Sequence, residues 1–95
     1  MHIYLTATLS SKPEFTEEVK TFLQHMVVES RKDAGCIQYN LHQGIDDQNV
    51  FVFQEIWESK AALDAHNEQP FIREFLELAQ TKLQTAPAVF LTDRI

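Results

Sequence analysis

A β-hairpin is predicted by residues 36–58, which read CIQYNLHQGIDDQNVFVFQEIWE. The first part, residues 36–42, alternates apolar and polar side chains with the two-residue period of a strand. Gly44 and the polar residues up to Asn49 form the expected turn. Residues 50–58 are rich in aromatic and β-branched side chains on both faces, which indicates a strand that is covered on both sides.

A strand and a helix are predicted before this hairpin. Residues 2–10 alternate in the same way, and residues 15–27 repeat apolar side chains at helical spacing. The sequence Ser11-Lys12-Pro13-Glu14 fits a capping box, and acidic residues follow in the first turns. Basic residues lie near the expected end of the helix, where Gly35 provides a stop.

A second helical region and a last strand are predicted after the hairpin. Ser59 is the expected N-cap, and the region breaks before Pro70 and resumes from Phe71 to Leu83. Residues 87–92 form the final strand. The order β-α-β-β-α-β is that of the ferredoxin-like fold, an α+β arrangement with an antiparallel sheet and helices on one face. At 95 residues, the chain is expected to be a single domain, 1–95.

The sheet face that the helices leave open is expected to be apolar. Strand alternation offers two sets of residues, one of which comprises Ile3, Leu5, Ile37, Tyr39, Leu41, Val52 and Ile56. An apolar patch of this size seldom stays in water. A chain this short also buries only about 60 to 65% of its unfolded surface. We therefore expect two sheets to pack face to face in a homodimer.

Charge and composition argue against several classes of partner. The chain has 8 basic and 14 acidic residues, and its largest basic cluster is the pair Arg31-Lys32. Nucleic acid is therefore not an expected partner. The single cysteine permits no intramolecular disulfide, and no signal peptide or apolar span of about 18 residues is recognisable. We predict a cytoplasmic protein with no membrane association.

The sequence contains no motif for a metal or a nucleotide. His2, His25, His42 and His66 are too far apart for a local metal pair, and neither CxxC nor HExxH accompanies them. Two glycines leave no glycine-rich loop for phosphates. Cys36 is expected to be a small structural hydrophobe. No metal site is therefore predicted.

Glu55 is an informative polar residue because alternation places its carboxylate between Phe53 and Trp57. Loss of water there raises the pKa of a carboxyl group unless a donor pairs with it. Glu55 is therefore either an acid–base group or a structural anchor. Trp57 either stacks on a flat ligand or packs in the core.

Two histidines are candidates for proton transfer. His66 lies one helical turn after Leu63, on the side expected to face the sheet. It either accepts a proton near neutral pH or is a structural histidine at the helix end. His42 shares a strand face with Gln38 and Asn40, and that polar face is either solvated or lines a polar pocket.

The stretch FQEIWESKAALDAHN at residues 53–67, followed by QPF at residues 69–71, resembles the antibiotic biosynthesis monooxygenase (ABM) family. The family pattern is E-x-W-x-S, then A-L and A-H, then a proline and an aromatic residue. GCIQY at residues 35–39 is similar to the family's G-C-x-x-Y before its second strand. The resemblance implies a dimeric α+β barrel whose subunits each have a pocket between the sheet and the helices.

For members that oxidise quinols or polycyclic phenols, the resemblance implies O₂ as co-substrate and no cofactor. The deprotonated substrate itself reduces oxygen, without a metal or a flavin. The pocket tryptophan and histidine of these members correspond to Trp57 and His42. Their pocket asparagine falls on Phe53, so an apolar ring replaces an amide.

Other relatives imply other reactions. Haem-degrading members require an asparagine, a tryptophan and a proximal histidine, where this chain has Thr6, His66 and Phe75. The missing proximal ligand disfavours haem oxygenation of that kind. Isomerases of phosphorylated sugars also occur among the relatives, but few basic residues are expected near this pocket.

The resulting hypothesis is a cofactor-independent monooxygenase that oxidises a quinol or polycyclic phenol with O₂. In this hypothesis His66 or His42 accepts the phenolic proton. The other site residues clamp the substrate ring (Trp57, Phe53, Phe71 and Phe75) or hold its oxygens (Thr6, Asn40 and Glu55). The alternatives are a non-catalytic module for small-molecule binding or self-protection, and a haem-binding protein.

Overall fold

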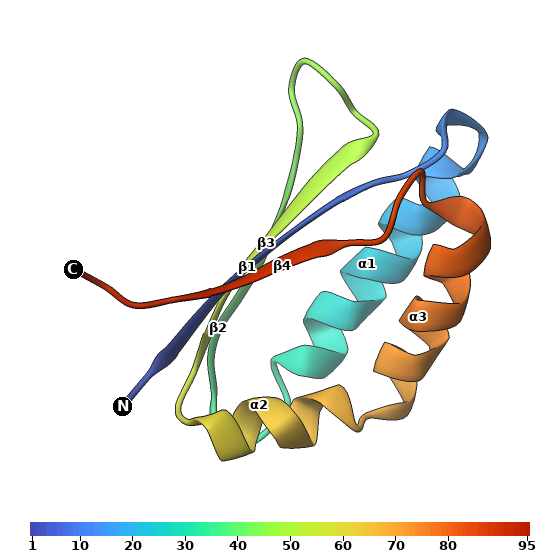
Figure 1. The fold of residues 1–95 in the computed structure, drawn as a ribbon. Helices are drawn as coiled ribbons and strands as arrows, with labels where there is room; N and C mark the ends of the chain where they lie inside the picture. Colours follow the sequence, from blue (N-terminus) through green and yellow to red (C-terminus); the bar gives the residue numbers. More distant parts are fainter.

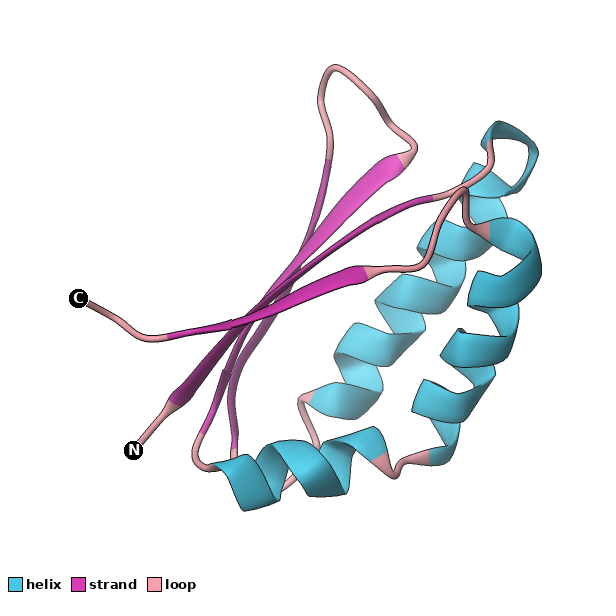
Figure 2. Ribbon diagram, viewed as in Figure 1, coloured by secondary structure: helices cyan, strands magenta, loops and turns pink.

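The computed structural model describes residues 1–95 as a four-stranded antiparallel sheet with helices on one face (Figures 1 and 2). The strand order across the sheet is β2-β3-β1-β4. This arrangement confirms the predicted ferredoxin-like α+β fold. The elements in chain order are β1 (Ile3–Ser10), the 3₁₀ turn η1 (Pro13–Phe15), α1 (Thr16–Ser30), β2 (Cys36–Gln43), β3 (Val50–Trp57), α2 (Lys60–Asn67), α3 (Pro70–Lys82) and β4 (Ala88–Thr92).

The core lies between the sheet and the helices. Leu5 of β1 pairs with Glu55 of β3, and Ala7 pairs with Phe53, so these residues share the face that the helices cover. Alternate residues of the two strands therefore enter the core, as the two-residue period requires. The other buried apolar residues are Leu9, Val19, Leu23, Met26, Tyr39, Phe51, Trp57, Leu63, Phe71, Phe75 and Leu83.

The open face of the sheet mixes polar and apolar side chains, which corrects the predicted apolar set. Leu5 and Tyr39 both lie opposite Glu55 and face the helices, whereas Val52 and Ile56 face away from them. Because β3 is apolar on both faces, its pattern does not reveal which face meets the helices. The residues that β1, β2 and β3 place on the open face include Tyr4, Thr6, Thr8, Gln38, Asn40, His42, Val52, Gln54 and Ile56.

The first helix begins with a 3₁₀ turn, so the predicted capping box is wrong. Pro13 begins this turn, and Ser11 Oγ bonds the hydroxyl of Thr16 at 2.9 Å rather than a helix N–H. The backbone N–H of the fully buried Ser11 donates to the carbonyl of Asn49 at 2.9 Å. Ser11 therefore ties the start of the helix to the hairpin turn. The predicted stop at Gly35 is wrong, because α1 already ends at Ser30 with Arg31 as its C-cap. Gly35, with a φ of 83°, lies instead in the turn just before β2.

The broken helical region and the last strand occur as predicted. Ser59 Oγ accepts a hydrogen bond from the N–H of Ala62 at 3.1 Å, which confirms the N-cap of α2. Pro70 begins α3 after the break. β4 is an edge strand with every residue exposed. None of the helices is both long enough and apolar enough to span a membrane.

Candidate active site

A pocket of about 310 Å³ lies between the helix-facing side of the sheet and helices α2 and α3. This volume is at the lower end of the range for small-molecule sites. Of its 17 lining residues, 12 are hydrophobic, so the pocket favours a largely apolar ligand. The ionisable and amide side chains in its wall are those of Tyr39, Glu55, Lys60, His66 and Asn67.

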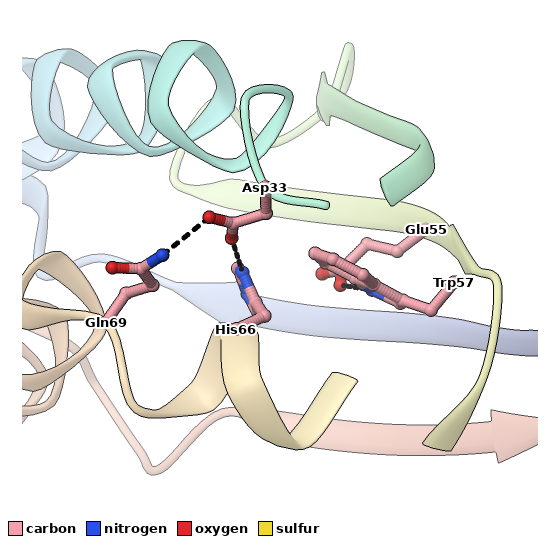
Figure 3. Close-up of polar contacts among 5 residues, drawn as sticks. All are labelled: Asp33, Glu55, Trp57, His66 and Gln69. Atoms are coloured by element: carbon pink, nitrogen blue, oxygen red, sulfur yellow. Dashed lines mark hydrogen bonds and ion pairs between the residues drawn. The ribbon is translucent and has the colours of Figure 1, made fainter. Parts of the chain in front are cut away.

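His66 lines this pocket from the last turn of α2 and is only 4% exposed. Its Nδ1 lies 2.9 Å from Asp33 Oδ2 (Figure 3). Burial lowers the pKa of His66, and the contact with Asp33 offsets part of this effect. The neutral ring is thus favoured, with Nδ1–H donating to the carboxylate. No protein group bonds Nε2, so its lone pair is available to a ligand.

Two chain connections bring Asp33 to His66. Asp33 lies in the turn between α1 and β2, where its N–H donates to the carbonyl of Ser30 at 3.0 Å. Gln69 precedes α3, and its own N–H donates to the carbonyl of His66 at 3.1 Å. The side-chain Nε2 of Gln69 donates to Asp33 Oδ1 at 2.7 Å (Figure 3). The two turns therefore hold the carboxylate and the imidazole together.

Glu55 and Trp57 form a second buried polar pair on one face of β3. Trp57 Nε1 donates to Glu55 Oε1 at 2.8 Å (Figure 3). Burial raises the pKa of Glu55 to about 7, and this hydrogen bond acts in the opposite direction. Glu55 lines the pocket, whereas Trp57 has no exposed surface. The Glu55 carboxyl can therefore donate or accept a proton near neutral pH.

Aromatic rings surround His66. The ring centroid of Trp57 lies 4.4 Å from that of His66, and those of Tyr39 and Phe71 lie 5.6 and 5.8 Å away. Burial raises the pKa of Tyr39, and the charge of Glu55 raises it further, so the phenol stays neutral. The indole face of Trp57 is suited to stabilise a protonated His66 by a cation–π interaction.

A comparison with protein families identifies the family of this chain. Residues 2–78 match the model of the family described as antibiotic biosynthesis monooxygenase. The chain belongs to this ABM family. The resemblance seen in the pattern from Phe53 to Phe71 is thereby confirmed.

Individual ABM relatives are similar over most of the chain. "Putative monooxygenase YcnE" of Bacillus subtilis is 35% identical over 85 residues, which cover 90% of this chain and 88% of YcnE. The crystal structure of PA3566 from Pseudomonas aeruginosa has a TM-score of 0.92 and 31% identity, and the match covers 99% of this chain and 94% of PA3566. The uncharacterized Synechocystis protein sll1783 is 35% identical over 75 residues, 79% of this chain. Because these residues are 51% of sll1783, the chain spans about half the length of that relative.

The ABM fold places six predicted site residues on the pocket side of the sheet. Phe53, Glu55, His66 and Phe75 line the pocket itself. Phe71 packs beside the His66 ring without lining the pocket. Trp57 lies behind His66 and Glu55 and has no exposed surface. In this structure it therefore cannot clamp a substrate ring, which corrects the prediction from the sequence.

The other three predicted site residues lie on the open face, which corrects the expected grouping. Asn40 and Thr6 both pair with Gln54, and His42 pairs with Val52, on the side away from the helices. His42 is exposed, and Asn40 Oδ1 accepts a hydrogen bond from Arg31 at 3.2 Å. Strand alternation separates these side chains from His66. Within one subunit, His42 therefore does not reach the pocket.

Sequence reasoning missed Asp33 and Gln69 as site residues. Asp33 lies in a turn that follows no helical or strand period, and its partner His66 is 33 residues away. From the sequence, Gln69 was recognised only as part of the family pattern at residues 69–71. The available signal was an acidic residue two positions before Gly35, which by itself does not distinguish a buried carboxylate from a solvated one.

The pocket offers few ligands for a metal or a haem iron. No group of three or more His, Cys, Asp or Glu side chains is arranged to hold a metal ion. Nε2 of His66 is the single imidazole nitrogen available in the pocket, because Nδ1 bonds Asp33. Phe75, where haem-degrading relatives are expected to have their proximal histidine, supplies an apolar ring to the wall.

Proposed function

We propose that this protein is a cofactor-independent monooxygenase that oxidises a small quinol or polycyclic phenol with O₂. The observation that carries the proposal is the unbonded Nε2 of His66 in an apolar pocket, with Asp33 fixed behind the ring. Membership of the ABM family and the name of the relative YcnE add support. The pocket volume of about 310 Å³ favours a substrate of a few fused rings at most.

His66 begins the proposed reaction as a general base. Its Nε2 takes a proton from the phenol or from the acidic carbon of an anthrone. The resulting anion gives electrons to O₂, and a C–O bond forms as a peroxide. The proton on His66 then returns to the outer peroxide oxygen. A second proton leaves the same carbon as the O–O bond breaks, and the outer oxygen leaves as water. For an anthrone, written R₂CH₂, the overall reaction of R₂CH₂ with O₂ gives R₂C=O and water, with four electrons transferred to O₂.

Glu55 and the pocket wall assist this chemistry in the proposal. With a pKa raised to about 7, Glu55 is partly protonated at neutral pH and can donate a hydrogen bond to a second substrate oxygen. Phe53 and Phe75 contact the faces of a flat substrate. The apolar lining excludes water that would otherwise protonate the substrate anion.

Oxygen uptake by the purified, metal-stripped protein tests the proposal. The substrates are a panel of naphthoquinols and anthrones, and the autoxidation rate without protein is the blank. We expect uptake above the blank, with one product molecule for each O₂ consumed. No uptake across the panel, together with a ligand-induced rise in melting temperature, would instead indicate a binding module.

Variants of two histidines identify the base. We expect His66→Gln to lower kcat by about 10² or more, because glutamine can still donate to Asp33 but cannot accept a proton. His42→Ala, on the open face, tests the other predicted base. Equal activity of wild type and His66→Gln, with loss of activity in His42→Ala, would reverse the assignment.

A further inference from the structure

Asp33 and His66 lie between two separate cavities. His66 lines the apolar pocket, whereas Asp33 does not line it and instead faces a groove at the molecular surface beside α1 and the start of α3. A substrate in the pocket therefore meets His66 and cannot touch Asp33. Any effect of Asp33 on the reaction must act through the imidazole.

The Asp33 carboxylate is fixed in position by its surroundings. Its side chain is 10% exposed, and each of its oxygens has one partner, His66 Nδ1 at 2.9 Å and Gln69 Nε2 at 2.7 Å. An ionised carboxylate only accepts hydrogen bonds, so the neutral imidazole must place its proton on Nδ1. This leaves the lone pair on Nε2, the nitrogen that no protein group bonds.

We propose that Asp33 is the positioning residue of the reaction. It keeps the His66 proton on Nδ1, leaves Nε2 free for the substrate proton, and stabilises the imidazolium while that proton is held. The inference rests on the proposed function. Because the proton returns to the peroxide within the same turnover, Asp33 needs no proton of its own.

On the pocket side, the other ionisable groups near His66 make no hydrogen bond to its ring. Glu55 accepts a hydrogen bond from Trp57. Burial keeps the phenol of Tyr39 neutral by raising its pKa. Lys60, at the pocket wall, bonds Asp64 at 2.6 Å. None of these groups bonds an imidazole nitrogen of His66, so none of them selects its tautomer.

On the groove side, the charged groups lie beyond Asp33. Glu29 bonds Lys32 at 3.0 Å on the exposed surface of α1. His25 and Glu74 line the same groove and make no hydrogen bond to Asp33. Asp33 is therefore the only charged group on the groove side that contacts His66. Glu29 provides a matched acidic control in the same groove.

Nitrogen NMR of the imidazole tests the inference without any substrate. His2, His25 and His42 are all exposed, so replacing each with Gln leaves His66 as the single histidine signal. In the ¹⁵N-histidine protein, we expect the neutral ring to carry its proton on Nδ1. In Asp33→Asn, loss of the negative charge is expected to lower the pKa of His66 by about one unit or more.

The kinetic test uses the oxygen-uptake assay with the same anthrone or quinol. For Asp33→Asn we expect kcat to fall by about tenfold or more and its acid-side pH limit to shift with the pKa of His66. KM should change by less than about twofold, because Asp33 does not line the pocket. Glu29→Gln should match the wild type in both constants.

A proton on Nε2 of the neutral His66 ring, in the protein that keeps Asp33, would overturn the inference. This result does not depend on whether Asp33→Asn folds. An unchanged His66 pKa in folded Asp33→Asn would also overturn it. The spectra report on Asp33 even when the wild type consumes no oxygen. Failure of the proposed function and failure of this inference are therefore distinguishable.

Discussion

At the scale of single residues, burial shifts the pKa values of Glu55 and His66, two of the titratable groups of the pocket, in opposite directions. The pKa of Glu55 rises from 4.5 to about 7, so its contribution to stability is full below pH 4.5 and is lost as pH rises through 7. The pKa of His66 falls below 6.5, so its contribution is present above pH 6.5 and is lost as pH falls through the lowered value. The same burial makes one group a candidate acid and the other a candidate base.

Glu55→Gln should remove the loss of stability on the alkaline side. Glutamine can still accept the hydrogen bond from Trp57 Nε1 but cannot ionise. From about pH 5 to about pH 8, the free energy of unfolding of the variant should rise relative to wild type by up to about 3 kcal/mol. Urea denaturation at a series of pH values measures this difference. If the free energy of unfolding varied with pH in the same way for Glu55→Gln and wild type, the prediction would be contradicted. The control is Glu77→Gln, at an exposed position.

At the scale of elements, the ends of the helices position the site. α2 begins at a serine cap and ends in the turn that carries His66 and Gln69. The connection between α1 and β2 carries Asp33 and reverses at Gly35. The geometry of the site therefore depends on the local structure of two turns as well as on the core.

Ser59→Ala should destabilise the protein by about 1 kcal/mol, because the N–H of Ala62 loses its side-chain acceptor. Ser59→Asp keeps an acceptor at the cap and should retain most of the stability. Equilibrium denaturation of both variants measures the difference. An equal loss in the two variants would show that the cap is not the cause.

Gly35→Ala should cost about 2 kcal/mol or more. The backbone has a φ of 83°, and an added Cβ would lie 2.6 Å from Cβ of Ala62. The double variant Gly35→Ala with Ala62→Gly removes the clash and leaves the strained φ. We expect the double variant to recover only part of the stability lost in Gly35→Ala, relative to Ala62→Gly alone. Wild-type stability in Gly35→Ala would contradict the prediction.

Periodicity was sufficient to predict the order of these elements, because strand and helix periods are local properties of the chain. It also placed Glu55 correctly beside Phe53 and Trp57 in the buried face. It did not assign the faces of β3, whose two sides are both apolar, and this led to the wrong composition of the open face. Periodicity likewise does not predict the contact between Asp33 and His66, since that contact joins a turn to a helix across 33 residues.

At the scale of the whole molecule, the sheet leaves apolar surface that one subunit does not cover. Phe90 of the edge strand β4 is 55% exposed, and Val52 and Ile56 lie on the open face. We continue to predict a homodimer in which two open faces pack together. Such packing would bury Thr6 and His42 in the interface rather than in the pocket.

Val52→Lys should convert this dimer to a monomer, because it places a charge at the centre of the open face. Sedimentation equilibrium should give about 22 kDa for wild type, twice the chain mass of 11.0 kDa, and the chain mass itself for the variant. Val28→Lys, at an exposed position of α1, is the matched control and should remain a dimer. A wild-type mass near 11.0 kDa at micromolar concentration would contradict the dimer.

The central claim is that His66 acts as the base of an oxygenation in this pocket. The most direct measurement is the reaction of an anthrone with ¹⁸O₂, followed by mass spectrometry of the product, for wild type and His66→Gln side by side. We predict one ¹⁸O atom in each product molecule formed by wild type and about 10² slower formation of labelled product by folded His66→Gln. Equal rates in the two proteins, or a wild-type product without ¹⁸O, would contradict the account.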